Sequence, residues 1–384
     1  MWYILRCQNF YYFKEIENMG FACGFVGLPN VGKSTLFNAL SHGGAAAANF
    51  PFCTIEPNTG VVPVPDKRLD ELAKLENSAK IVPATMKFID IAGLVEGASQ
   101  GQGLGNQFLG HIRGVDAVAH VVRLFADSDV VHVSGSIDPS RDLELILTEL
   151  MLADLDFLQN KLEKSRKLFR SGDPELKLEL EITQSFIKDL EDGRMPSWNR
   201  EDPKVRAVVA SMQMLTTMPA FVCANTDETA FRNFGKDDVS KKLIETAAKH
   251  GMEVVPVCAK LEEELGQLDP EEAAVFLEDI GVTESGLERV IHTGYRLLDY
   301  ITFFTAGPTE AHAWTITRGM TAPEAAGKIH TDMLRGFIRM EVVSYDDIIK
   351  YGGWNEAKLA GKLRIEGKEY IVQDGDNVFV RFSV

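Results

Sequence analysis

A glycine-rich stretch near the start of the chain constrains the fold more than any other sequence feature. Residues 27–34 read GLPNVGKS and match the phosphate-binding pattern G-x-x-x-x-G-K-[ST] without substitution. In this pattern the glycines let backbone N–H groups wrap a phosphate chain, and the lysine charge and the hydroxyl serve the outer phosphates and Mg²⁺. An apolar run precedes it and a helix-forming run follows it, at 21–26 and 34–40. The order strand, loop, helix N-terminus predicts a nucleoside triphosphate site.

The motif also predicts which residues contact the nucleotide. Lys33 is expected to act on the outer phosphates and in catalysis, and Ser34 to bind Mg²⁺. The predicted phosphate contacts are Asn30, Val31, Gly32, Lys33, Ser34 and Thr35.

Alternating apolar and amphipathic segments predict an α/β fold with a mostly parallel sheet. Further strands are expected at 86–91, 117–122, 220–224 and 253–258. From about Asp142, leucines recur at helical steps and predict an antiparallel pair of helices, coiled-coil-like in character. Asp173 is expected to cap the second of these helices, with Pro174 at its first position.

The chain is predicted to have four parts, and its C-terminal part changes character. The parts are an N-terminal extension (1–18), a P-loop G domain (19–141 and 207–300), a helical coiled-coil insertion within it (142–206), and a C-terminal α+β domain (301–384). Met19 is the expected native start. In the last part, Thr321 and Glu324 fit a capping box, and Asp374-Gly375 fits the turn of a hairpin over 370–380.

Composition limits the classes of partner. The chain has 384 residues and a formal net charge of −16, which argues against a nonspecific polyanion binder. Five scattered cysteines form no C-x-x-C pair, which predicts reduced thiols and a cytoplasmic location. No apolar run approaches the ~18 residues of a membrane helix. We therefore expect no membrane and no DNA partner.

A second motif predicts a nucleotide-dependent switch. Residues 90–93 read DIAG and follow a predicted strand, as D-x-x-G does in switch NTPases. There Asp90 would reach Mg²⁺ through water, and the Gly93 N–H would sense the γ-phosphate. Thr54 lies in the loop between the two motifs and is a candidate second hydroxyl ligand of Mg²⁺, with a plain turn residue as the alternative.

The position that orients the attacking water in Ras-like GTPases is occupied by Leu94, which cannot form a hydrogen bond. Either hydrolysis is slow or another group positions the water. Three histidines are candidates. His120 lies within an apolar strand and is expected to be a core residue with its hydrogen bonds satisfied. His111 follows a helical segment and is expected to face solvent. His132 lies on a loop that could reach the γ-phosphate.

The base-reading motif departs from the guanine code. GTPases use N-K-x-D after a strand, whereas residues 225–228 read NTDE here. The lysine is missing, and Glu228 is one methylene longer than aspartate. Asn225, Thr226 and Glu228 are therefore predicted to contact a base other than guanine, which makes ATP plausible. The alternative is a degenerate guanine site that still prefers GTP.

Taken together, these residues resemble the YchF family, the Obg-like ATPases within the translation-factor class of P-loop proteins. The resemblance covers nearly the whole chain from Met19 to Val384. Its motifs are GLPNVGKS at 27–34, PFCTIEPN at 51–58, DIAGLV at 90–95, the N-x-x-E of 225–228, IHTD at 329–332 and GFI at 336–338.

This resemblance implies a fold, a nucleotide and roles for single residues. It implies a G domain with a coiled-coil insertion, followed by a TGS domain of β-grasp type. It also implies a preference for ATP over GTP, Mg²⁺ held by Ser34 and Thr54, and an adenine edge read partly by backbone near Thr226. His132 occupies the position of a family histidine proposed to replace the missing glutamine.

Partners and activity remain open between alternatives. The family is linked to ribosome binding and stress responses, which implies a role in translation or stress regulation. RNA contacts are expected through the TGS and helical parts. An ATP-hydrolysing switch is favoured; the alternatives are a GTP-dependent ribosome-assembly factor and an RNA- or ribosome-binding scaffold with nucleotide as a structural ligand. Asn30 stands where potassium-activated P-loop switches hold K⁺, with a loop-stabilising role as the alternative.

Overall fold

Two compact units make up the chain, as shown in a computed structural model that describes residues 21–47, 58–91, 104–126, 136–165 and 173–383. The first unit comprises Met1–Val61 and Lys87–Val290. The second comprises Val62–Met86 and Ile291–Val384. The predicted P-loop domain included Val62–Met86, but this segment groups with the C-terminal part of the chain. The extension at 1–18 lies outside the described residues.

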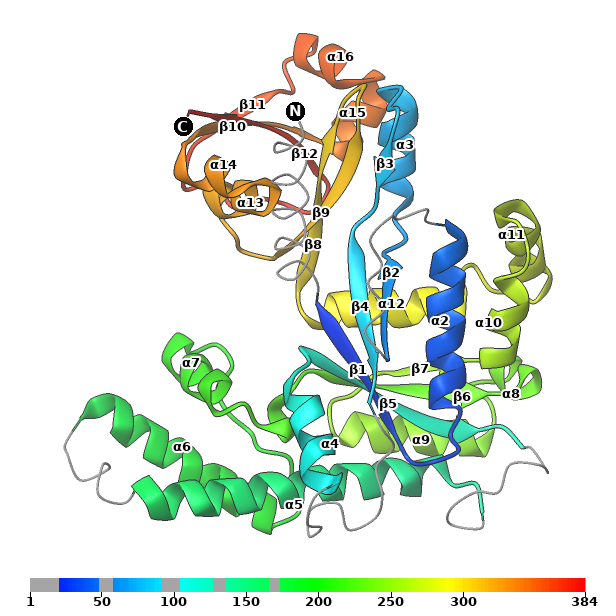
Figure 1. Ribbon diagram of the computed structural model, residues 1–384, viewed down its shortest axis with the longest axis vertical. Coiled ribbons are helices and arrows are strands. Elements are labelled where there is room, and N and C mark those ends of the chain that lie inside the picture. The colour runs from blue at the N-terminus through cyan, green and yellow to red at the C-terminus, as the bar shows by residue number, and fades with distance from the viewer. Residues whose placement is uncertain (1–20, 48–57, 92–103, 127–135, 166–172, 384) are drawn as a thin grey trace, which may run out of the picture. The chain divides into compact units, whose positions relative to one another are not determined.

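A six-stranded sheet in the order β2-β4-β1-β5-β6-β7 forms the P-loop fold (Figure 1). The pairs β1–β4, β1–β5, β5–β6 and β6–β7 are all parallel, which confirms the predicted mostly parallel sheet. The strands are β1 (Ala22–Gly27), β2 (Thr59–Pro63), β4 (Thr85–Asp90), β5 (Ala117–Leu124), β6 (Ala220–Thr226) and β7 (Val254–Val257).

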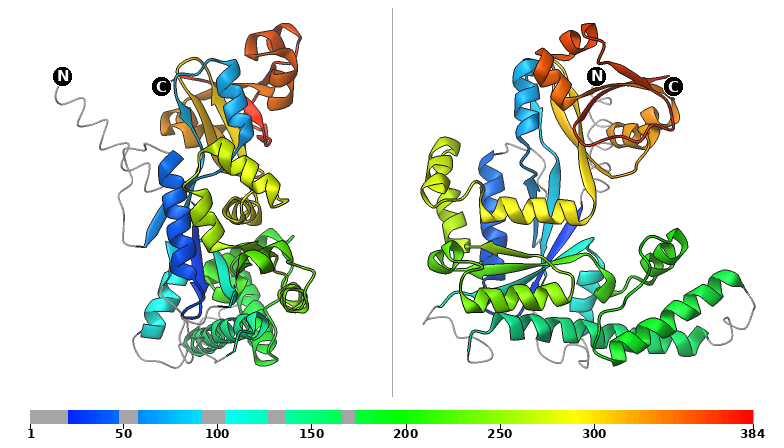
Figure 2. Two further views of the ribbon diagram at one scale, coloured as in Figure 1. Left: turned by 90° about the vertical axis from the view of Figure 1, so that its right-hand side faces the viewer. Right: turned by 180° about the vertical axis from the view of Figure 1, so that it is seen from behind.

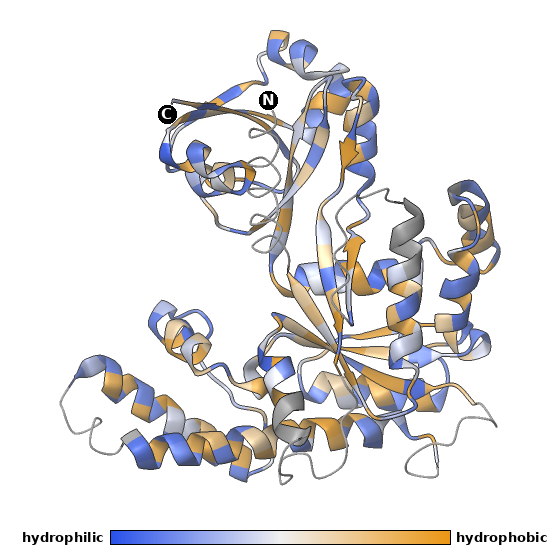
Figure 3. Ribbon diagram, viewed as in Figure 1, coloured by the Kyte–Doolittle hydropathy of each residue, from blue (hydrophilic) through white to orange (hydrophobic). Residues whose placement is uncertain are grey.

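Helices cover this sheet and bury its apolar strands. On one face α5 and α9 pack with the strand residues Val122 and Val222, through Leu143 and Leu243. The strands are correspondingly apolar along most of their length (Figure 3). The helices are α2 (Lys33–Ala47), α4 (Leu104–Arg113), α5 (Pro139–Ser165), α6 (Pro174–Glu191), α7 (Pro203–Met212), α8 (Glu228–Arg232), α9 (Asp238–Lys249), α10 (Ala259–Leu265), α11 (Pro270–Asp279) and α12 (Gly286–Leu297), with a 3-10 turn at Leu215–Thr217.

The predicted helical pair is present as α5 and α6, which contact each other and lie side by side in the right-hand view of Figure 2. Asp173 caps α6 by accepting from the Glu175 N–H at 2.8 Å, with Pro174 in the first turn, as predicted. The sequence analysis missed a third helix, α7, which packs with the pair through Val209 and Met212. We call these three helices, α5, α6 and α7, the helical arm, and they share one apolar cluster.

The second unit contains a separate sheet in the order β11-β10-β12-β8-β9-β3. Its core lies between the sheet and α13, where Phe303, Ile316, Met340 and Val342 are buried with Ala325. The elements are α3 (Lys67–Leu75), β3 (Ile81–Val82), β8 (Tyr300–Ala306), β9 (Ala311–Thr317), α13 (Ala322–Ile329), α14 (Thr331–Arg335), β10 (Phe337–Ser344), α15 (Tyr345–Tyr351), α16 (Trp354–Leu359), β11 (Arg364–Glu366) and β12 (Asp376–Phe382). The predicted C-terminal α+β fold is confirmed.

The predicted hairpin at Asp374-Gly375 is wrong. Strand β12 pairs antiparallel with β10 and parallel with β8, whereas Ile371 makes only an isolated bridge to Thr321. The turn chemistry is present, since Gly375 has φ +85°. The partner of β12 is chosen instead by burial, because Val378 and Val380 complete the same apolar core as β10.

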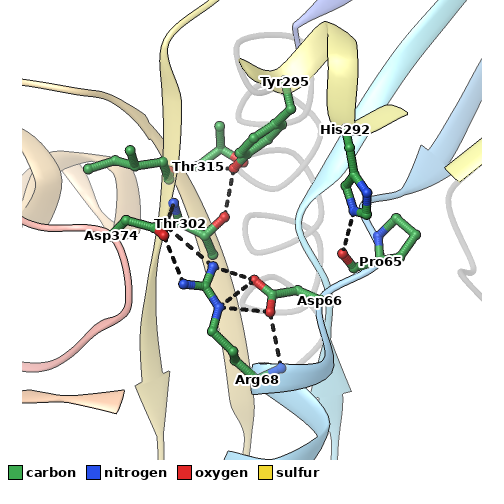
Figure 4. A network of polar contacts seen from close by, with 9 residues as sticks. Pro65, Asp66, Arg68, His292, Tyr295, Thr302, Thr315 and Asp374 are labelled. Atoms are coloured by element: carbon green, nitrogen blue, oxygen red, sulfur yellow. Dashed lines mark hydrogen bonds and ion pairs between the residues drawn. The ribbon is translucent and has the colours of Figure 1, made fainter. Parts of the chain in front are cut away.

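An arginine fastens the segment Val62–Met86 to the rest of its own unit (Figure 4). The Arg68 guanidinium donates to both carboxylate oxygens of Asp66, and to Asp374 at 2.9 and 3.3 Å. It also lies 5.2 Å from the ring centre of Phe304. Asp374 in turn accepts from the Thr302 N–H at 3.0 Å. Burial alone would lower the pKa of Arg68, but its hydrogen bonds to the two carboxylates raise it.

We expect Arg68→Ala to loosen the attachment of α3 to β8. Removing the guanidinium leaves the partly buried Asp66 and the exposed Asp374 without their shared partner, at a cost of about 1–2 kcal/mol after allowance for exposure. Hydrogen exchange of backbone amides in 67–75 and 300–306 measures the effect. The control is Arg318→Ala, which breaks an exposed pair with Asp299 and should change nothing measurable. Equal loss of protection in both variants would contradict this role.

None of the helices in the described part of the chain has the length and apolar composition needed to cross a bilayer.

Candidate functional site

The phosphate-binding loop connects β1 to α2 and has the backbone of an anion nest. Asn30 (φ +64°) and Gly32 (φ +83°) both occupy the left-handed region, on either side of Val31. Alternation of this kind turns successive N–H groups toward one side of the loop. At Gly32 a side chain is excluded twice, since its φ favours glycine and a Cβ would collide with the Asn225 amide. The second glycine of the motif is thus required by the geometry of the loop.

Three predicted residues meet at the start of α2. Lys33 is largely buried and forms an ion pair with Asp90, the last residue of β4. The Ser34 hydroxyl donates to the other carboxylate oxygen of Asp90 at 2.9 Å. Strand β4 is paired with β1, which explains why residues so distant in sequence converge. The structure therefore places the D-x-x-G aspartate beside the lysine and serine of the phosphate loop.

Asn225 connects the phosphate loop to the start of α10. It is buried at the end of β6, where its amide donates to the Val31 carbonyl at 2.9 Å. Its amide oxygen lies 3.5 Å from the Ala259 N–H, at the start of α10. Because both ends of this amide have protein partners, Asn225 supports the site from within. The sequence motif located the residue but did not reveal these two contacts.

The other two residues predicted to contact the base, Thr226 and Glu228, differ in exposure. Thr226 is buried, and its hydroxyl donates to the Val257 carbonyl at 3.2 Å. Glu228 is exposed in the first turn of α8. The intervening Asp227 caps that helix by accepting from the Ala230 N–H at 2.8 Å. Both acids of NTDE are exposed, and Asp227 is engaged in capping the helix.

A buried carboxylate lies one turn into α10. Glu262 accepts from the Gly286 N–H at 2.7 Å, at the beginning of α12. Burial raises the pKa of Glu262 to about 7, although hydrogen bonds from Gly286, Ser285 and Leu287 oppose the shift. Helix α10 begins beside Asn225, so Glu262 connects this helix to the start of α12.

We expect Glu262 to make stability depend on pH. A carboxyl whose pKa is raised on folding favours the folded state at low pH, and its contribution becomes unfavourable as pH rises between the unfolded value and about 7. Glu262→Gln keeps an acceptor for Gly286 and removes the charge. Chemical unfolding should therefore show the variant to be more stable than the parent at pH 8, by about 1–3 kcal/mol, with a smaller difference at pH 5.

The exposed neighbour Glu263 provides the control for this test. Glu263→Gln should change stability equally little at both pH values. A Glu262→Gln variant whose advantage is the same at pH 5 and pH 8 would contradict a raised pKa.

The candidate histidines differ in their exposure to solvent. His111 is exposed on α4, as expected. His120 is buried within β5, as expected, but its Nδ1 finds no hydrogen-bond partner among the described residues, so the prediction of a satisfied core residue holds for its burial and not for this nitrogen. Burial, with a smaller effect from His250, lowers the pKa of His120 to about 4. His132, Thr54 and Gly93 lie outside the described residues, and their roles stay predictions.

Sequence reasoning missed two residues at the end of β5. Arg123 is almost completely buried, and its Nη1 lies 3.4 Å from the Asn30 carbonyl of the phosphate loop. Its guanidinium also lies 4.4 Å from the ring centre of Phe125. A charged residue closing an otherwise apolar strand run was the signal available in the sequence.

Comparisons with known proteins agree along the chain. Residues 22–161 match a family described as 50S ribosome-binding GTPase, and residues 300–383 match the YchF-GTPase C-terminal family, described as a protein of unknown function. Proteins from Haemophilus influenzae and Haemophilus ducreyi, both named ribosome-binding ATPase YchF, are 52% and 53% identical over 366 residues. These alignments cover 95% of this chain and 100% of each relative.

A solved structure is similar over almost the same extent. The structure of the Schizosaccharomyces pombe YchF GTPase matches with a TM-score of 0.84 and 36% sequence identity. The match covers 94% of this chain and 98% of that one. Relatives thus carry both nucleotide names, ATPase and GTPase, which leaves the choice of base to the residues of the site.

Proposed function

This chain belongs to the YchF family, and we propose that it is a Mg²⁺-dependent ATPase of slow intrinsic rate whose nucleotide state is read by the ribosome. The observation that carries the proposal is the convergence of Lys33, Ser34 and Asp90 at the phosphate loop. The relatives named ribosome-binding ATPase support the ribosome as partner. An ATPase of this kind would act in the cytoplasm, with no DNA or membrane partner.

The residues at the phosphate loop fit a magnesium ion. Mg²⁺ prefers oxygen ligands and is commonly held by one or two protein groups together with substrate phosphates. Ser34 supplies a hydroxyl, and Asp90 a carboxylate within hydrogen-bond distance of it. Thr54 is the proposed second hydroxyl ligand.

Lys33 is proposed to exchange partners when nucleotide binds. Its ammonium group forms an ion pair with Asp90 at the start of α2, next to the phosphate loop. A triphosphate would compete for the ammonium, and Asp90 would then be free to orient water on the metal. The remaining contacts to the phosphates are proposed to come from Asn30, Val31, Gly32 and Thr35.

Adenine is the proposed base because the guanine code is incomplete. In N-K-x-D sites the aspartate accepts from guanine N1–H and the 2-amino group, whereas adenine N1 is itself an acceptor. Thr226 and Asn225 are engaged with protein carbonyls, which favours reading of the adenine edge by backbone near Thr226. Glu228 contributes from the surface. A guanine site using Glu228 remains the competing proposal.

Hydrolysis is proposed to depend on residues of the switch loops. His132 would position the attacking water in place of the glutamine missing at Leu94, and the Gly93 N–H would sense the γ-phosphate. Asn30 is proposed to hold K⁺ beside the phosphates. ATP turnover should then be faster in K⁺ than in Na⁺ at equal ionic strength, and equal rates would remove the potassium proposal.

The ribosome contacts are proposed to involve the second unit and the helical arm, through RNA. Residues 301–384 carry ten Lys and Arg against eleven Asp and Glu, so this part is nearly neutral in a strongly acidic chain. Near neutrality lowers the repulsion from phosphate. On the arm, Lys161 is paired with Glu179 at 2.6 Å, which reduces what it can offer to RNA.

Co-sedimentation with ribosomes separates the switch from the scaffold. A switch should sediment differently with Mg²⁺–ATP, with Mg²⁺–ADP and without nucleotide. A scaffold should sediment equally in all three conditions, and that result would reject the proposed switch.

A further inference from the structure

Arg123 is the largest side chain among those almost completely buried in the described residues, and it lies beneath the phosphate loop. Burying a guanidinium is costly unless its donors are satisfied. Its Nε donates to the Phe125 carbonyl at 3.0 Å, and Nη1 lies 3.4 Å from the Asn30 carbonyl. A leucine or methionine would fill apolar space here at lower desolvation cost. The contact with the loop therefore suggests a role in the site.

Arg123 and its neighbour Asn225 contact two successive carbonyls of the phosphate loop, one each. The two residues are register partners at the ends of β5 and β6. Arg123 contacts the carbonyl of Asn30, and Asn225 donates to the carbonyl of Val31. Two neighbouring strand ends thus hold consecutive peptide groups of the loop from the same protein side.

Peptide geometry converts these contacts into an orientation of N–H groups. A trans peptide is planar, so its N–H points away from its C=O. All described peptides are trans. Holding the Asn30 carbonyl toward the protein directs the Val31 N–H the other way, and holding the Val31 carbonyl does the same for the Gly32 N–H. These are the groups that a phosphate nest presents to its anion.

Phe125 fixes the position of the guanidinium. Its ring centre lies 4.4 Å from the Arg123 Cζ, within the range of a cation–π contact. The same ring borders the loop, since a Cβ at Gly32 would lie 3.5 Å from its Cε1. Arg123 is therefore held by a backbone carbonyl and a ring on one side, and contacts the loop on the other.

We propose that Arg123 is a positioning residue for the nucleotide phosphates, which orients the Asn30–Val31 peptide of the loop for phosphate binding. The inference rests on the proposed nucleotide function and adds a residue to it. The role concerns the phosphate chain and not the base, and this distinction makes it testable.

Calorimetric titration with ATP and with adenosine, both in Mg²⁺, tests the proposal. Arg123→Met should weaken ATP binding about 10- to 100-fold, the loss expected for a hydrogen bond to a charged group and the order it imposes. Adenosine has no phosphates, so its affinity should stay within about twofold. A purely structural role would weaken both ligands in proportion, and that result would overturn the proposal, as would unchanged ATP affinity.

Two further variants keep the test decisive. Arg123→Lys retains the charge and the aliphatic stem but not the planar fork, so it should fold and still weaken ATP binding, by about tenfold. If Arg123→Met does not fold, equal ATP affinity of Arg123→Lys and the parent overturns the proposal. Arg113→Met removes another arginine that faces a ring, that of Phe157, and should leave ATP affinity unchanged. A parent chain that fails to bind ATP would instead reject the proposed function.

Discussion

Lys33→Ala is expected to abolish ATP binding at concentrations that saturate the parent chain. The ammonium group is largely buried at the nest and paired with Asp90. Its removal deletes the positive charge for the outer phosphates and leaves the Asp90 carboxylate without that partner, so the phosphates would meet an uncompensated negative charge. A loss of about 100-fold or more in affinity and turnover follows from the sum of these effects. Calorimetric titration with Mg²⁺–ATP measures the affinity, and the rate of phosphate release measures the turnover.

The matched control is Lys241→Ala, which removes an exposed lysine from α9 of the same unit. Affinity and turnover should stay at the parent values, because a solvated surface charge contributes little. Lys33→Ala binding ATP as tightly as Lys241→Ala would contradict the assignment of the phosphate site.

His132→Ala is expected to separate binding from turnover. If His132 positions or deprotonates the attacking water, its removal should lower kcat by about 100- to 10 000-fold, the usual contribution of a general base. ATP affinity should change by less than about threefold, since the group acts only in the transition state. Single-turnover hydrolysis, together with calorimetric ATP titration, measures the two quantities on one preparation.

His111→Ala is the control for this variant, because His111 is exposed on α4. It should hydrolyse ATP at the parent rate. A His132→Ala variant with unchanged kcat would show that another group positions the water in place of the glutamine missing at Leu94.

The phosphate loop could be predicted because its chemistry is local. The motif fixes the order strand, loop and helix, and its glycine positions report backbone demands that single residues reveal. The same holds for the caps at Asp173 and Thr321: the Thr321 N–H bonds the Glu324 carboxylate at 2.8 Å. Each of these signals involves residues within a few positions of one another.

Features that depend on distant partners could not be predicted in this way. Asp374-Gly375 has the composition of a hairpin turn, yet strand β12 pairs with β10 and β8 because its valines complete a shared core. Val62–Met86 groups with the C-terminal part through distant contacts, such as the pairing of β3 with β9 and the ion pair of Arg68 with Asp374, more than 300 residues away. The contact of Arg123 with the Asn30 carbonyl could likewise not be predicted, because the two residues are distant in sequence and meet only in the folded chain.

Competition between ATP and GTP for one site tests the central claim most directly. Each nucleotide is titrated by calorimetry into the full chain, in Mg²⁺ with K⁺, first alone and then in the presence of the other. The account predicts that ATP binds more tightly and that GTP displaces it poorly, since residues 225–228 lack the lysine and aspartate that read guanine. Tighter binding of GTP, lost on Glu228→Ala, would contradict it and assign Glu228 to guanine.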